Sequence, residues 1–128
     1  MNLVAGNFGE CGSVNAFYAK TVKYNDTDIA TKEAVFEAPA PMLITQVGVD
    51  VTTAFNAGTT NVLTLGTNND ADNICGSSDI SESKGASTKA VFVQLAKGDK
   101  VYAKYAQTGT DATAGVADIY FIGTQLPE

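Results

Sequence analysis

Residues 43–65, LITQVGVDVTTAFNAGTTNVLTL, contain the clearest structural signal of the chain. In the first part, apolar residues at positions 47, 49, 51 and 55 alternate with polar residues at positions 46, 50 and 52. A period of two is typical of a β-strand that buries one face. Residues 56–60 include a glycine and interrupt this pattern, and a second apolar run follows at residues 62–65. We therefore expect a β-hairpin here.

The same alternation recurs on both sides of this segment. Residues 89–96 and 100–107 flank Lys97-Gly98-Asp99, which predicts a second hairpin. Further strands are expected at residues 16–24, 33–37 and 116–122. Strand signals separated by turns about every 8–15 residues favour an antiparallel sandwich or barrel. The predicted fold class is all-β, an antiparallel β-sandwich of seven or eight strands.

Two segments lack strand patterning. Residues 68–88 are rich in Asn, Asp, Ser and Gly and predict a long polar loop, while residues 1–15 contain three glycines and predict an extended N-terminal arm. A chain of 128 residues is the length of a single domain. We expect an arm over residues 1–15 and a single β-sandwich domain over residues 16–128.

The ionisable residues exclude several classes of function. The chain contains no histidine and no tryptophan, all eight basic residues are lysine, and the net charge is −6. Catalytic triads with histidine and histidine-ligated metal sites are excluded, as is bidentate recognition by arginine. The acidic balance argues against nucleic acid as a partner, and no apolar run is long enough for a membrane span. We expect no enzyme activity and no cofactor, and without a secretory signal we expect synthesis in the cytoplasm.

The cysteines and one acidic loop are further candidates for chemistry. Cys11 and Cys75 are expected to be free thiols, because a cytoplasmic protein rarely forms disulfides and their spacing matches no metal motif. Within residues 68–73, Asn68, Asp70 and Asp72 have the spacing of calcium ligands, with Asp79 further along. A calcium-binding loop would also have a central glycine and a glutamate at its last position, and both are missing here. The sequence therefore favours a polar surface loop whose side chains form hydrogen bonds with their own backbone.

The aromatic residues suggest where the protein binds. Phe92, Tyr102 and Tyr120 lie opposite in parity to the apolar face of their strands, so their side chains are expected to point outward. Either loops or the edge of the other sheet cover them, or they form an apolar patch that meets a neighbouring subunit. With Phe8 in the predicted arm, they are our candidate contacts with another subunit or with a capsid.

Several turn and strand motifs together resemble a protein family. Residues 52–60 (TTAFNAGTT), 63–67 (LTLGT) and 109–115 (GTDATAG), with the strands beside them, resemble small structural proteins of tailed bacteriophages and prophages. The resemblance covers about half of the chain. It implies a jelly-roll-like β-sandwich. It also implies a role in the virion, as a decoration protein of the head. It also implies the major capsid protein or other virion proteins as partners, and a homo-oligomer; such proteins are often trimers.

The resemblance leaves a second function open. A receptor- or glycan-binding module of a phage tail or head fibre would present a sugar site lined by tyrosines. The candidates for that site are Tyr18, Tyr24, Tyr102, Tyr105 and Tyr120. The absence of tryptophan counts against this alternative, because sugar-binding sandwiches usually display that residue.

Overall fold

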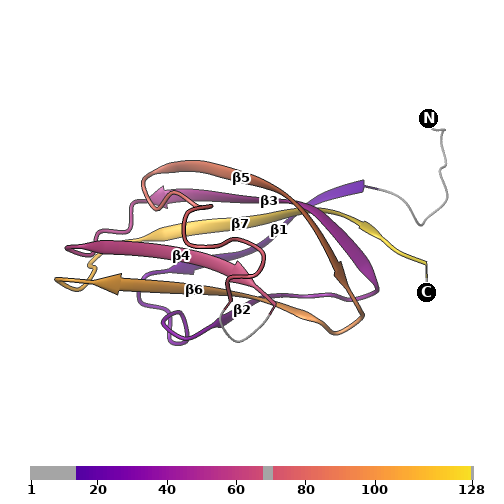
Figure 1. Ribbon diagram of the computed structural model, residues 1–128, viewed down its shortest axis with the longest axis horizontal. Helices are drawn as coiled ribbons and strands as arrows, with labels where there is room; N and C mark the ends of the chain where they lie inside the picture. Colours follow the sequence, from indigo (N-terminus) through magenta and orange to yellow (C-terminus); the bar gives the residue numbers. More distant parts are fainter. Residues whose placement is uncertain (1–13, 68–70, 128) are drawn as a thin grey trace.

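The computed structural model describes residues 14–67 and 71–127. Within these residues the chain forms strands and no helix, and the strands run along the long axis of the molecule (Figure 1). The seven strands are β1 (Val14–Lys23), β2 (Glu33–Glu37), β3 (Met42–Thr53), β4 (Thr60–Gly66), β5 (Gly85–Leu95), β6 (Lys100–Thr108) and β7 (Val116–Gln125). They form two antiparallel sheets, which confirms the predicted all-β sandwich.

The chain changes sheets at every connection. The odd-numbered strands form a four-stranded sheet in the order β1-β7-β3-β5, and the even-numbered strands form a three-stranded sheet in the order β2-β6-β4. These two strand orders are those of a jelly roll that lacks one edge strand, the one next to β4. Val14 pairs with Thr124, so both ends of the described chain lie at one end of the sandwich (Figure 1).

Neither predicted hairpin forms. β3 pairs with β5 and β7, whereas β4 pairs with β6, so the connection over residues 54–59 crosses from one sheet to the other. The turn predicted at Lys97-Gly98-Asp99 exists, with Gly98 at a φ of +89°. However, its Gly98 N–H donates to the carbonyl oxygen of Ala38 at 2.8 Å, just after β2. Strands that are neighbours in sequence therefore face each other across the core and pair with distant strands.

The core lies between the sheets and follows the predicted alternation. Val47, Val49 and Val51 are buried, as are the inward residues of β6 and β7: Val101, Ala103, Tyr105, Ala117, Ile119 and Phe121. The alternation of β3 changes near Thr45, where its register shifts against both neighbouring strands. Because of this shift, Ile44 also points into the core, although its parity differs from that of Val47.

The loop after β4 occupies the place of the missing eighth strand. Its described part begins at Ala71, and β5 begins at Gly85, so the loop ends four residues earlier than the predicted range 68–88. Cys75 forms an isolated antiparallel bridge with Leu65 at the free edge of β4. The loop also contributes buried side chains to the sandwich, and these belong to Ala71, Ile74, Cys75 and Ile80.

The predicted N-terminal arm falls mostly outside the described residues. Val14 and Asn15, its last two residues, belong to β1, and Phe8 and Cys11 lie outside the part that the structure describes. Among the described residues, no helix has the length and hydropathy required to cross a membrane.

Candidate interaction surfaces

The outer side of the four-stranded sheet carries an uncharged surface, which we call the aromatic face. Residues of alternating parity on each of the four strands point outward here, because their neighbours along the strand fill the core. The aromatic face is the part of this outer side, towards Phe92, whose residues carry no charge at neutral pH. The aromatic face comprises Ala16, Tyr18, Leu43, Gln46, Gly48, Thr88, Ala90, Phe92, Tyr120 and Ile122.

Two tyrosines form a pair on this face. Tyr18 of β1 is the direct cross-strand partner of Tyr120 of β7, and their ring centroids lie 5.6 Å apart. Both are exposed, Tyr18 by 53% and Tyr120 by 40%. The Tyr18 hydroxyl donates to Thr21 Oγ1, because that Thr21 hydroxyl donates its own proton to Asp118 Oδ1. These bonds hold the Tyr18 ring in place beside Tyr120.

Beside this pair, a shallow groove of about 250 Å³ crosses the sheet. Its lining is mostly apolar, and its floor includes Gly48, which pairs with Tyr120 on one side and Thr88 on the other. A Cβ at Gly48 would lie 3.9 Å from Tyr120 Cβ, an ordinary contact, so the glycine leaves open space without being required by the fold. The lining residues are Ala16, Gln46, Gly48, Thr88, Tyr120, Phe121 and Ile122.

Phe92 is the most exposed large apolar residue described, with 81% of its surface accessible. It lies on β5, the edge strand of the four-stranded sheet, where Val91 and Phe92 stand opposite the single residue Thr45 of β3. Such bulges re-aim side chains on edge strands. Phe92 therefore stands out from the aromatic face beyond one end of the groove.

The opposite end of this side of the sheet is acidic. Asp50 of β3 and Asp118 of β7 are direct cross-strand partners, two residues beyond the Gly48–Tyr120 pair and on the side away from Phe92. Facing carboxylates repel each other. The outer side of this sheet thus has one end with carboxylates and an uncharged remainder.

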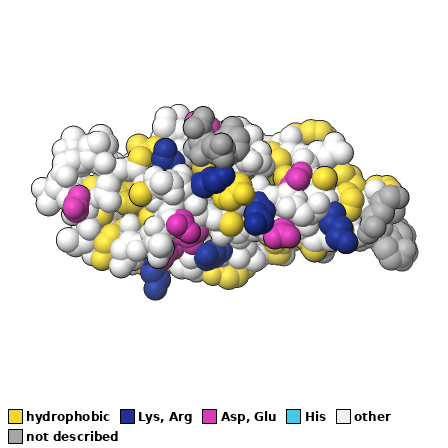
Figure 2. All heavy atoms as spheres, turned by 90° about the horizontal axis from the view of Figure 1, so that it is seen from below, with side chains coloured by type: hydrophobic (Ala, Val, Ile, Leu, Met, Phe, Trp, Pro, Cys, Tyr) yellow, Lys and Arg dark blue, Asp and Glu magenta, His cyan; other side chains and the backbone are white. Residues whose placement is uncertain are grey.

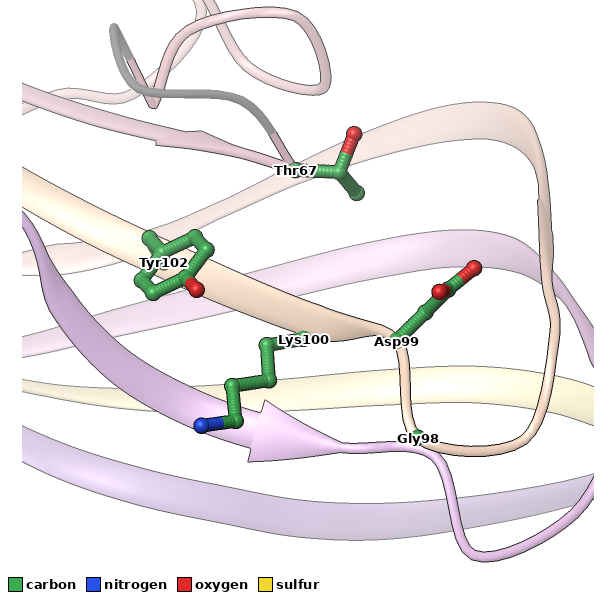
Figure 3. A pocket seen from close by; sticks show the side chains of 5 residues that line it. All are labelled: Thr67, Gly98, Asp99, Lys100 and Tyr102. Carbon is green, nitrogen blue, oxygen red and sulfur yellow. The ribbon is translucent and has the colours of Figure 1, made fainter.

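Tyr102, the third predicted outward aromatic, lies on the other side of the molecule. It belongs to β6 of the three-stranded sheet, and the ammonium group of Lys32 lies 4.4 Å from its ring centroid. With residues from the end of β4 and the β5–β6 turn, it lines an open depression of about 480 Å³ (Figure 3). The lining residues are Thr67, Gly98, Asp99, Lys100 and Tyr102.

The surroundings of Tyr102 are charged. Figure 2, which views the molecule from the side where β2 and β6 lie in Figure 1, shows lysine and carboxylate side chains interspersed over the surface. The structure therefore separates the sequence candidates: Phe92 and Tyr120 share the uncharged aromatic face, and Tyr102 lies in a charged environment on the opposite sheet.

One ion pair, between β1 and β2, contains a buried carboxylate. Lys20 Nζ lies 2.8 Å from Glu33 Oε2, and Glu33 is only 7% exposed. Glu33 Oε1 is buried with no hydrogen-bond partner. Burial, together with the nearby Asp26 carboxylate, raises the pKa of Glu33, while the bond to Glu33 raises the pKa of Lys20.

Side chains of the acidic loop are bound by groups of the protein itself. Asp79 Oδ2 accepts hydrogen bonds from Lys89 Nζ at 2.7 Å and from the backbone N–H of Gly76 at 2.8 Å. Asn73 Oδ1 accepts from the backbone N–H of Thr67. Among residues 14–67 and 71–127, no group of three or more cysteine, aspartate or glutamate residues could hold a metal ion. Residues 68–70 of the predicted cation motif lie outside the described residues.

The five tyrosines named for a sugar site do not converge. Tyr105 is 1% exposed in the core, where its hydroxyl donates to Asn61 Oδ1. Tyr24 is half-buried, and Tyr102 lies on the opposite sheet from Tyr18 and Tyr120. The sequence did not indicate Tyr18 as a candidate subunit contact, although cross-strand pairing places it directly beside Tyr120.

Comparison with known proteins relates the whole fold to a viral structure. The chain is similar to a chain of the cyanophage Pam1 capsid asymmetric unit, with a TM-score of 0.67 and 19% sequence identity. The match covers 98% of this chain and 94% of that chain. No family model and no curated protein sequence matches the chain. At this identity, the similarity shows a shared fold over almost the entire length of both chains.

Proposed function

We propose that this chain is a non-enzymatic structural protein of a tailed-phage particle, and that it binds the assembled head as a decoration protein. The observation that carries the proposal is the fold similarity to a chain of a phage capsid asymmetric unit over 98% of this chain. The phage-like strand and turn motifs at residues 47–67 and 100–115 support it independently. In this proposal the major capsid protein is the partner, and the protein is made in the cytoplasm of the host bacterium before joining the virion.

Binding surfaces, not an active site, are what such a role requires. The two sheets supply two chemically different surfaces, the uncharged aromatic face and the charged surface around Tyr102. We assign the charged surface to the capsid, because a water-exposed mixture of lysines and carboxylates gives specific, salt-dependent contacts. Residues 1–13, including Phe8, precede β1 at one end of the sandwich and add a second capsid contact in this proposal.

A binding assay tests this function. The purified full chain is mixed with phage heads assembled without it, and the heads are sedimented. We expect saturable co-sedimentation that weakens when residues 1–13 are deleted and when Tyr102 and Lys100 are replaced by serine. Failure of the full chain to sediment with heads at any salt concentration would show that it is not a head-binding protein.

A further inference from the structure

We propose that the aromatic face is an interface between two copies of this chain, related by a two-fold axis, in which Phe92 of each copy enters the groove of the other. The inference rests on the geometry of one sheet and does not depend on the phage role. Such an interface requires a protruding apolar group, a hollow that matches it, and an uncharged surface around both.

Phe92 supplies the protruding group. Its side chain is 81% exposed on a strand whose other outward residues near it, Ala90 and Gln94, are small or uncharged. Exposure of a phenylalanine side chain to water is unfavourable, so its burial in an interface lowers the free energy. Exposed apolar surface that is contiguous, as Phe92 and the neighbouring groove are on this face, marks interaction sites.

The groove supplies the hollow. Its volume is about 250 Å³ and its lining is mostly apolar. A cavity of about 150 Å³ is enough to bind benzene in a protein interior, so a phenyl ring fits in this space. Gly48 keeps the floor open, and the ring of Tyr120 stands at one wall, where it can pack against an incoming ring.

The size and charge of the face suit a second copy that binds weakly. Four strands at about 4.8 Å and the six residues from Leu43 to Gly48 at about 3.3 Å each give a footprint of about 380 Å². This is about half of the roughly 800 Å² that each partner of a standard-size interface buries, and interfaces of this size belong to weak complexes. Because no residue of the aromatic face is charged, two copies meet without burying an unpaired charge.

The positions of the two features agree with two-fold symmetry. Phe92 and the groove lie on the same side of the sheet. A two-fold axis in the plane of that face, midway between them and perpendicular to the line that joins them, exchanges their positions. Each contact then occurs twice, as in any isologous interface. Asp50 and Asp118 lie on the far side of the groove from Phe92, so that this operation leaves the acidic ends of the two copies apart at the rim.

Two substitutions test the contact from both sides. Phe92→Ser removes the protruding ring from an exposed position, and Gly48→Val fills the groove at a position where a Cβ meets only an ordinary contact. We expect the full chain to sediment at about twice its 13.3 kDa mass in the micromolar range. Each variant is expected to weaken self-association at least about tenfold. Tyr102→Ser is the matched aromatic control on the opposite sheet, and we expect it to leave self-association unchanged.

Thermal unfolding of each variant separates loss of the interface from loss of the fold. A β-branched residue suits a strand interior better than glycine, so Gly48→Val is expected to keep or raise the unfolding temperature of the monomer. A wild-type chain that is monomeric at about 100 μM overturns the proposal. So does a self-association that neither variant weakens. Saturable glycan binding that Gly48→Val abolishes, with the wild-type chain monomeric, would assign the groove to a sugar instead.

A crosslinking experiment tests the symmetry itself. In a Cys11→Ser background, the double variant Phe92→Cys with Gly48→Cys places a thiol on each side of the proposed contact. A two-fold interface closes two disulfides within a pair, so that mild oxidation is expected to stop at a covalent dimer. Covalent trimers or longer chains would show a head-to-tail contact and overturn the two-fold arrangement.

Discussion

Cys75 pairs with Leu65 through an isolated antiparallel bridge, so that one loop residue extends the three-stranded sheet beyond β4. The Leu65 N–H donates to the Cys75 carbonyl oxygen at 3.1 Å, and the Cys75 N–H donates to that of Leu65 at 2.9 Å. These bonds satisfy backbone groups at an edge that would otherwise be open to pairing with another chain. They also hold the thiol of Cys75 in the core, where 1% of the residue is exposed.

Cys75 is therefore expected to be unreactive in the folded protein. Burial raises the pKa of the thiol to about 11, so only about one molecule in a thousand carries the thiolate at pH 8. In a Cys11→Ser chain, an aromatic disulfide reagent should label Cys75 at least about 100-fold more slowly than after unfolding in denaturant. Labelling that is equally fast with and without denaturant would show that the loop does not stay packed on β4.

Gly115 is expected to tolerate replacement less well than Gly98, another turn glycine with a positive φ. Its φ is +154°, and a Cβ would lie 2.4 Å from Cδ2 of the Phe55 ring, which is buried. Gly115→Ala should lower the free energy of unfolding by about 2–4 kcal/mol, because backbone strain and a clash in the core add together. Gly98→Ala is the matched control, with a φ of +89° and open space around the new Cβ, and should cost about 1 kcal/mol. Equal losses in urea unfolding would mean that the Phe55 contact has no effect.

The Lys20–Glu33 ion pair gives a stability effect that depends on pH. Lys20→Met leaves the buried Glu33 carboxylate without its cation and close to Asp26. Since Lys20 is half-exposed, water screens the pair, and the loss at pH 7 should be about 1–2 kcal/mol, below that of a fully buried pair.

The direction of the pH effect follows from the raised pKa of Glu33. Folded Glu33 binds a proton more readily than the unfolded carboxyl, whose pKa is near 4.5, so folding takes up protons above that pH. The Lys20→Met variant should therefore regain stability relative to the wild type as the pH falls from 7 towards 4.5. Adding Glu33→Gln should remove this dependence, and a pH profile that Glu33→Gln leaves unchanged would contradict the assignment.

Strand positions and buried faces could be predicted from the sequence because they depend on local alternation. Val47, Val49 and Val51 occupy the core as expected. Pairing could not be predicted in the same way, because β3 and β7 are partners more than 60 residues apart along the chain. Two short connections with glycine were interpreted as hairpin turns, whereas both carry the chain from one sheet to the other.

For the aromatic face too, local alternation could be read from the sequence, whereas the pairing of strands could not. Parity alone placed Phe92 and Tyr120 on the outside, and both are exposed. It could not show that they share a face that excludes Tyr102, because that depends on which sheet each strand joins. The contribution of Tyr18 was hidden by the register shift between Tyr18 and Lys20, which breaks the alternation of β1.

Electron cryomicroscopy of phage heads incubated with the purified full chain tests the central claim most directly. The account predicts ordered density for a two-sheet sandwich at repeated positions on the head, with the three-stranded sheet and residues 1–13 towards the major capsid protein. Heads without added density at saturating protein, or the sandwich bound only to a tail or fibre, would contradict a role as a head decoration protein.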